Sequence, residues 1–184
     1  MDPIIWKGIL YHSLEYFNLI ESEENYVAVS RIIGSFEDKI YFVNYHITID
    51  KDWLVQNFTI EYEVNGIKSK VEGIKNESDW EINGTKRPEC SNFRYIDISL
   101  TPFTNTLPIN NLKLSENQSE EINVIYINIL ENIIKPVKQQ YTKISKSEYL
   151  YENIPKNFEA KISVDNLGLI EYYPDLFEKK HNID

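Results

Sequence analysis

The residues best suited to chemistry lie in one stretch, 94–109, whose sequence is RYIDISLTPFTNTLPI. Asp97 supplies a carboxylate in the middle of an alternating apolar and polar pattern that predicts a strand. A charge at such a position must be solvated or well paired. Asp97 therefore either faces water or caps the polar residues that follow it, or lies inside the fold and hydrogen-bonds to sugar hydroxyls. Arg94 and Arg31 are its candidate partners, because buried carboxylates favour a guanidinium.

Thr104, Asn105 and Thr106 follow in the same stretch, between Pro102 and Pro108. Pro102 lacks a backbone donor, so regular strand pairing should end there. Short polar side chains can hydrogen-bond to nearby backbone and fix a turn without glycine. We expect a rigid polar corner, which can hold the turn, contact a ligand, or do both.

Other candidates for ligand binding lie outside this stretch. Trp53 and Trp80 could stack on a sugar ring, since an indole offers a flat apolar face with one donor, or they could belong to the core. Gln139 and Tyr141 project to the same side of a predicted strand and could add polar contacts. The predicted ligand-binding residues are Trp53, Trp80, Arg94, Asp97, Thr101, Thr104, Asn105, Thr106, Gln139 and Tyr141.

Patterns typical of catalysis and metal binding are scarce. The histidines are His12, His46 and His181, and no Gly-x-Ser-x-Gly elbow accompanies them. His46 lies on the polar face of a predicted strand, where it is either a structural residue or a base that could act with Asp97. No His-x-x-x-His or Glu-x-x-His spacing suggests a metal, and no glycine-rich loop suggests a nucleotide, so we expect neither metal nor cofactor.

The composition limits the partners and the compartment. A net charge of −10 argues against nucleic acid or an anionic membrane surface as the main partner. The single cysteine, Cys90, excludes an internal disulfide and favours a reducing compartment, so the cytoplasm is predicted. We expect no secretory signal and no integral membrane segment, because no apolar run reaches transmembrane length. The oligomeric state is not readable from the sequence.

Patterns typical of strands cover most of the chain, and its 13 Tyr and 8 Phe also favour strands. Asn65-Gly66 is the strongest hairpin signal, and Asn83-Gly84 marks another reversal. Segments with strand patterns occupy 4–8, 13–21, 25–35, 39–50, 53–64, 67–75, 79–82, 94–101, 137–145, 147–152, 158–165 and 169–173. So many strands cannot form one open twisted sheet, so we predict a single all-β domain over 1–184, a rolled antiparallel meander with a frayed tail at 178–184.

The segment 122–134 is ambiguous. Its apolar residues fall on a helical stripe, yet it is built from Ile, Val, Asn and Tyr, which are poor helix formers. Propensity favours a strand that Pro136 closes.

Several motifs carry a family resemblance, in the same order over nearly the whole chain. SDWEING, YIDISLTPFTNTLPI, QQYT and FEAKISVDNLGLIEYYPDL resemble the bacterial family described as "putative glycolipid-binding". The resemblance implies a long antiparallel sheet rolled into a spiral or partial barrel, with a strand around Tyr126. The family name rests on a likeness in shape to carriers of lipidic molecules. Relatives tend to have two arginines after Leu-Pro-Ile, whereas this chain has Asn110 and Asn111, so any arginine contact to an anionic head group is lost here.

Three hypotheses follow. The leading one is a non-enzymatic protein that binds an amphipathic, lipid-like molecule, such as a glycolipid, in the hollow of the rolled sheet. The alternative is a hydrolase or isomerase acting on a small hydrophobic substrate, with Asp97 as acid or base. The third is a structural or protein-interaction domain whose interior is filled by its own side chains.

Overall fold

The computed structural model describes residues 1–180, and its strands form one 15-stranded sheet. The strands that precede the central stretch are β1 (Ile4–Gly8), β2 (Ser13–Glu21), β3 (Asn25–Phe36), β4 (Lys39–Asp50), β5 (Val55–Val64), β6 (Ile67–Asn76), β7 (Asp79–Ile82) and β8 (Thr85–Lys86). A 3-10 turn, η1 (Pro88–Cys90), then leads to β9 (Tyr95–Ile98) and the helix α1 (Phe103–Leu112). The remaining strands are β10 (Ser119–Asn128), β11 (Ile133–Lys143), β12 (Glu148–Asn153), β13 (Glu159–Val164), β14 (Ile170–Tyr173) and β15 (Phe177–Lys180).

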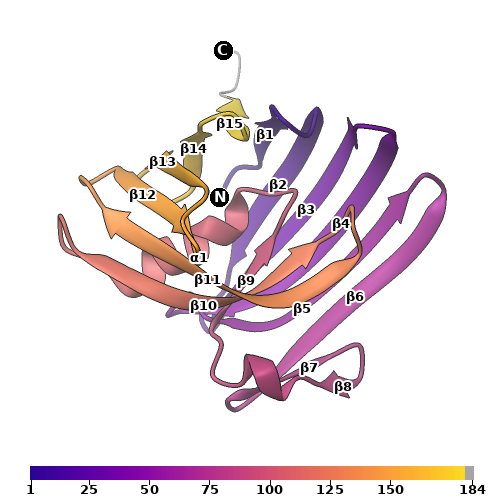
Figure 1. The fold of residues 1–184 in the computed structure, drawn as a ribbon, viewed down its shortest axis with the longest axis horizontal. Helices are drawn as coiled ribbons and strands as arrows, with labels where there is room; N and C mark the ends of the chain where they lie inside the picture. Colours follow the sequence, from indigo (N-terminus) through magenta and orange to yellow (C-terminus); the bar gives the residue numbers. More distant parts are fainter. Residues whose placement is uncertain (181–184) are drawn as a thin grey trace.

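The sheet is a rolled meander that does not close into a barrel, as predicted. Its strand order is β8-β7-β6-β5-β4-β3-β2-β1-β15-β14-β13-β12-β11-β10-β9, so the first and last strands pair in the middle, and β8 and β9 form the two edges. All neighbours are antiparallel except β9 and β10, which are parallel. The two halves of the sheet curve around α1 (Figure 1). A hydrogen bond from the Tyr62 hydroxyl to Asn132 Oδ1, 2.7 Å long, ties the β10–β11 turn to β5 on the opposite half.

The turns that the sequence predicted most clearly are present. Asn65 and Gly66 have φ angles of 49° and 82° and connect β5 to β6. Asn83 and Gly84, with φ of 51° and 72°, connect β7 to β8 in the same way. Both residues of such a turn need positive φ, which asparagine and glycine tolerate best.

The predicted polar corner is wrong, because residues 103–112 form a helix. Pro102 lies at its N-cap, where the missing backbone donor costs nothing. Pro108 lies inside the helix and removes one helical hydrogen bond. Residues 103–109 are all buried, so burial stabilises a segment whose threonines and asparagines are weak helix formers. Within residues 1–180, no helix is long and apolar enough to span a membrane.

Three further parts of the chain differ from the expectation. Segment 122–134 is extended, as propensity predicted, but it is divided between β10 and β11 by a turn at 129–132. Pro136 lies inside β11 rather than ending it, paired with Ile125 on one side. The pairing of β11 with β12 begins only at Gln139. On that side Pro136 therefore has no neighbouring strand that would need its missing backbone N–H. Residues 178–180, predicted to fray, belong to β15, whereas 181–184 lie outside the described residues.

The interior of the roll is largely filled by α1. Phe103 is fully buried at the start of the helix. The centroid of its ring lies 4.6 Å from the ring centroid of Phe17 on β2 and 6.5 Å from that of Tyr45 on β4. Apolar side chains from both halves of the sheet surround it in one continuous core. The space left for a ligand must therefore lie beside the helix rather than along the whole roll.

Candidate functional site

A cavity of about 300 Å³ lies between the start of α1 and the half of the sheet that contains β10 to β15. Its lining comes from many separate elements: Leu10, Tyr11, Asp97, Ile98, Ser99, Thr101, Asn105, Tyr126, Tyr151, Phe158, Tyr173, Leu176 and Phe177. Three of the predicted ligand-binding residues, Asp97, Thr101 and Asn105, are among them. Most of the rest are aromatic or aliphatic, and a predominantly apolar wall with a few polar groups is typical of ligand sites.

The carboxylate of Asp97 is held by two neutral donors. Gln139 Nε2 donates to Oδ2 at 2.7 Å, and the hydroxyl of Thr104, on the first turn of α1, donates to Oδ1 at 3.1 Å. Burial raises the pKa of this carboxyl, and the two hydrogen bonds oppose that rise. Arg94 and Arg31, the candidate partners, are both exposed, and no ion pair to Asp97 is present in residues 1–180. Each carboxylate oxygen retains a lone pair for a ligand.

Asn105 is positioned from the same helix. Its Oδ1 accepts a hydrogen bond of 2.8 Å from the buried Tyr141 hydroxyl, and its Nδ2 donates to the Pro102 carbonyl at 3.3 Å. Five of the predicted residues, Asp97, Thr104, Asn105, Gln139 and Tyr141, lie within one hydrogen-bond network. Gln139 and Tyr141 do project to the same side of β11, because alternate strand residues share a face.

Tyrosine hydroxyls supply most of the remaining polar atoms of the cavity. Those of Tyr11, Tyr126, Tyr151 and Tyr173 make no hydrogen bond to any other group within residues 1–180, so their capacity to donate and accept is unused. Burial raises the pKa of Tyr11, Tyr126 and Tyr151, and the nearby Asp97 carboxylate raises it further. These four hydroxyls are neutral near pH 7 and could bind either donors or acceptors of a ligand.

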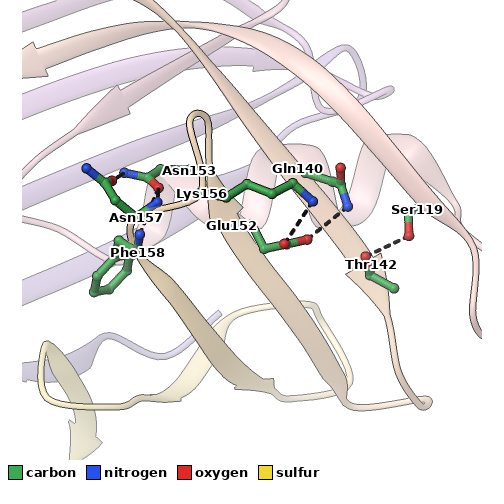
Figure 2. Close-up of polar contacts among 8 residues, drawn as sticks. All are labelled: Ser119, Gln140, Thr142, Glu152, Asn153, Lys156, Asn157 and Phe158. Carbon is green, nitrogen blue, oxygen red and sulfur yellow. Dashed lines mark hydrogen bonds and ion pairs between the residues drawn. The ribbon is translucent and has the colours of Figure 1, made fainter.

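The rim of the cavity is apolar and partly exposed. Leu10, in the β1–β2 turn, is 44% exposed, and Phe158, before β13, is 40% exposed. Figure 2 shows how the β12–β13 turn is fixed: Asn153 Oδ1 accepts the backbone N–H groups of Asn157 and Phe158 at 3.1 and 2.9 Å. In the same view, Glu152 accepts hydrogen bonds from Gln140 and Lys156. The bonds to Asn153 fix the backbone of this turn up to Phe158 without a glycine.

Sequence reasoning missed a second interior carboxylate, Glu15 on β2. Only 2% exposed, it accepts hydrogen bonds at Oε1 from the hydroxyls of Ser30 and Tyr45, both at 2.7 Å, and of Thr101 at 2.9 Å. Its Oε2 is buried without a partner in the described residues. Burial raises the pKa of Glu15 to about 7, although the hydroxyls oppose the rise. Leu14, Tyr16 and Ile20 are apolar or aromatic but exposed, and they lie on the face of β2 opposite Glu15. Because both faces of the strand carry such residues, its hydrophobic pattern gave no signal that Glu15 is buried.

The structure does not bring the other predicted residues to the cavity. Trp80 is fully buried in the core and donates to the Phe93 carbonyl at 3.0 Å. Trp53 lies in the β4–β5 turn and stacks on the ring of Tyr26, 4.8 Å away. Thr106 is fully buried inside α1, with its hydroxyl unpartnered in the described part of the chain.

The residues considered for catalysis are separated. His46 is exposed on the outer face of β4, beside the buried Tyr45 and Ile47, and it is absent from the lining of the cavity. Asp97 is the one carboxylate in that lining, which has no histidine. His181 lies outside the described residues. Within 1–180, no group of three or more His, Cys, Asp or Glu side chains could hold a metal ion.

A larger groove, of about 1080 Å³, lies elsewhere, against β1 to β5. Its wall includes the exposed apolar side chains Leu14, Ile33, Ile40 and Phe42. The smaller cavity is the better candidate site, because there the Asp97 carboxylate and four unpaired tyrosine hydroxyls converge on one space.

Asn110 and Asn111 replace the arginines expected by the family resemblance, and both are structural anchors. Asn110 Nδ2 donates to the Leu167 carbonyl at 2.9 Å, and Asn111 Nδ2 donates to the Asp52 carbonyl at 2.7 Å. Asn111 Oδ1 also accepts the hydroxyl of Tyr95. These bonds attach the end of α1 to loops in both halves of the sheet, and neither asparagine lines the cavity.

Comparison with known proteins agrees with this architecture. Residues 3–179 match the family described as "Putative glycolipid-binding", formerly DUF1089. A crystal structure of a DUF1089 family protein from Pseudomonas aeruginosa is similar to this chain, with a TM-score of 0.80 and 30% sequence identity over 89% of this chain and 91% of that one. None of the curated proteins searched matches the chain significantly.

Proposed function

Because the chain belongs to the "Putative glycolipid-binding" family, we propose that it is a non-enzymatic binding protein for an amphipathic, lipid-like molecule, such as a glycolipid. The observation that carries this proposal is the cavity beside α1, where Asp97 and four unengaged tyrosine hydroxyls face one space with an apolar rim. An amphipathic ligand matches that division, with its polar head among these groups and its tail against the rim.

The size of the cavity sets how much of the ligand enters. About 300 Å³ is at the lower end of the range for small-molecule sites. The polar head and the first carbons of the tail fill it, and α1 occupies the rest of the roll. Leu10 and Phe158 then offer exposed apolar surface over which the tail can continue.

Affinity and orientation come from different parts of the site. Apolar contact with the tail contributes about 25 cal/mol for each Å² removed from water. The polar groups, Asp97 and Asn105 with the tyrosine hydroxyls, select the head and fix its direction. The network of Gln139, Thr104 and Tyr141 behind them holds these groups in place before binding, which lowers the entropy cost.

Binding is favoured over catalysis by the position of His46 on the outer face, away from Asp97. We place the protein in the cytoplasm, a location that its single cysteine supports, because Cys90 is a buried free thiol.

Native mass spectrometry of the protein purified from its own host tests the proposal, together with thermal unfolding in the presence of lipid extracts. We expect a co-purifying mass of an amphipathic molecule and a stabilisation of about 2.7 kcal/mol at a ligand concentration 100 times Kd. Leu10→Asp at the rim should remove both effects. Leu14→Asp is the matched control, since this exposed leucine lines the larger groove of about 1080 Å³ instead of the cavity.

Absence of any mass shift and of any stabilisation across repeated extracts would contradict the proposal. Equal losses from Leu10→Asp and Leu14→Asp would place the ligand elsewhere on the molecule.

A further inference from the structure

The charge of the cavity is one-sided. Asp97 contributes a carboxylate to the lining, and no lysine, arginine or histidine is among the lining residues. Within residues 1–180, the carboxylate makes no ion pair and is held only by the neutral side chains of Gln139 and Thr104. A carboxylate removed from water without a counter-ion is costly, and a cation beside it offsets that cost.

The walls around this carboxylate are aromatic. Tyr11, Tyr126, Tyr151, Phe158, Tyr173 and Phe177 all line the cavity. Their rings meet at different tilts: Tyr151 and Tyr173 have centroids 6.0 Å apart at 59°, and Tyr11 and Phe177 have centroids 5.9 Å apart at 34°. Rings in several orientations around one space can present more than one negative π face to a ligand.

One of these rings already has an ammonium over it. Lys135 pairs with Tyr126 across β10 and β11, and its Nζ lies 5.9 Å from the centroid of the Tyr126 ring. This distance is within the range of a cation–π contact. Directly paired residues of neighbouring strands share a face, so Lys135 lies on the same side of the sheet as Tyr126. Its side chain is exposed, however, and it is not among the lining residues of the cavity.

Building on the proposed function, we infer that the polar head accepted by this cavity is cationic: an ammonium group, primary or quaternary, on an apolar tail. The ammonium would lie against the tyrosine faces with Asp97 as its counter-ion, in the manner of aromatic cages that bind alkylated amines. A phosphate, sulfate or carboxylate head would instead meet the Asp97 charge with no cation in the lining to offset it. A neutral sugar could hydrogen-bond to the tyrosine hydroxyls but would leave the carboxylate without a counter-ion.

Three ligands with the same tail distinguish these heads: octyltrimethylammonium, octyl β-glucoside and octyl sulfate. Their dissociation constants are measured by isothermal titration calorimetry below the micelle concentration of each, at fixed ionic strength. We expect the ammonium to bind about tenfold more tightly than the glucoside, and the sulfate to bind more weakly than either.

Asp97→Asn keeps the shape of the side chain and removes its charge. In this variant the ammonium should lose about tenfold in affinity, while the glucoside changes by no more than about threefold. Glu61→Gln, at an exposed position on β5, is the charge-matched control and should change neither. Tyr126→Leu, which removes one ring but no hydrogen bond, should weaken the ammonium selectively and serves if Asp97→Asn does not fold.

The outcomes separate the two proposals. Tighter binding of the glucoside or of the sulfate overturns the inference of a cationic head but leaves the proposed binding function standing. Tighter binding of the ammonium that persists in both Asp97→Asn and Tyr126→Leu also overturns it, because the cation then binds elsewhere. Failure of all three ligands to bind counts against the proposed function as well.

Discussion

The hydroxyl of Thr101 donates a hydrogen bond of 2.9 Å to Oε1 of Glu15, and so joins two residues 86 positions apart in the chain. Thr101 also accepts the backbone N–H of Phe103, the first residue of α1, at 3.1 Å. The buried carboxylate of β2 is therefore attached to the start of the helix that fills the roll. Through Thr101 it also reaches the wall of the candidate site.

Glu15→Gln should change the pH dependence of stability. The folded-state pKa of Glu15 is about 7 against an ordinary value of 4.5, so between these values the folded state binds more protons than the unfolded state, and stability falls as pH rises. The loss of folding stability caused by ionising the buried Glu15 is absent below pH 4.5 and complete above about pH 8, where it is about 3 kcal/mol. Urea unfolding should show Glu15→Gln more stable than the wild type at pH 8 and equal to it near pH 4.5. If the free energies of unfolding of the wild type and Glu15→Gln change in parallel with pH across this range, the expected ionisation of Glu15 is excluded.

Tyr141→Phe tests the network behind Asp97. The substitution removes the donor to Asn105 Oδ1 and leaves a buried acceptor unpaired, which should cost about 1–3 kcal/mol in the free energy of unfolding. Tyr172→Phe, at an exposed position in β14, should cost less than about 0.5 kcal/mol. Equal changes in the two variants would show that the hydrogen bond to Asn105 contributes nothing.

Gly168 should be less tolerant of alanine than Gly66. Both have positive φ, +75° and +82°, but a Cβ on Gly168 would lie 2.3 Å from Asn110 Oδ1, whereas one on Gly66 meets nothing within 4 Å. Gly66→Ala should cost about 1 kcal/mol through strain alone. Gly168→Ala should cost about 1 kcal/mol more, because Asn110 must move and lose its bond to Leu167. In an Asn110→Ala background that excess should disappear in urea unfolding, and its persistence would point to a different clash.

Cys90 should react slowly with thiol reagents while the protein is folded. The side chain is fully buried, and burial raises the pKa of its thiol, so little thiolate is present near neutral pH. Labelling with a disulfide reagent should be at least about a hundredfold slower than in urea. An exposed thiol from Asn92→Cys in a Cys90→Ala background should label rapidly without denaturant. Rapid labelling of native Cys90 would mean that the η1 segment opens readily.

The local elements of this fold could be read from the amino-acid sequence. The long alternating strand at 39–50 has the predicted limits, because every second residue from Tyr41 to Ile49 is apolar and the period of two leaves no other solution. The hairpin at Asn65-Gly66 followed from its need for positive φ. These signals act between neighbours in the chain, so no tertiary information was required.

The helix α1, the inward side of β2 and the cavity were decided only by tertiary structure. Residues 103–109 are helical because the rolled sheet buries them on all sides, which outweighs the weak intrinsic preference of their threonines and asparagines. Strand β2 has apolar residues on both faces, and its register with β1 and β3 turned Glu15 inward, where hydroxyls from β3, β4 and the α1 N-terminus stabilise it. The sequence by itself placed Asp97 in one strand, and Gln139 and Tyr141 on one face of another. Which tyrosines would surround that carboxylate depended on how 15 strands roll, and no local pattern encodes that curvature.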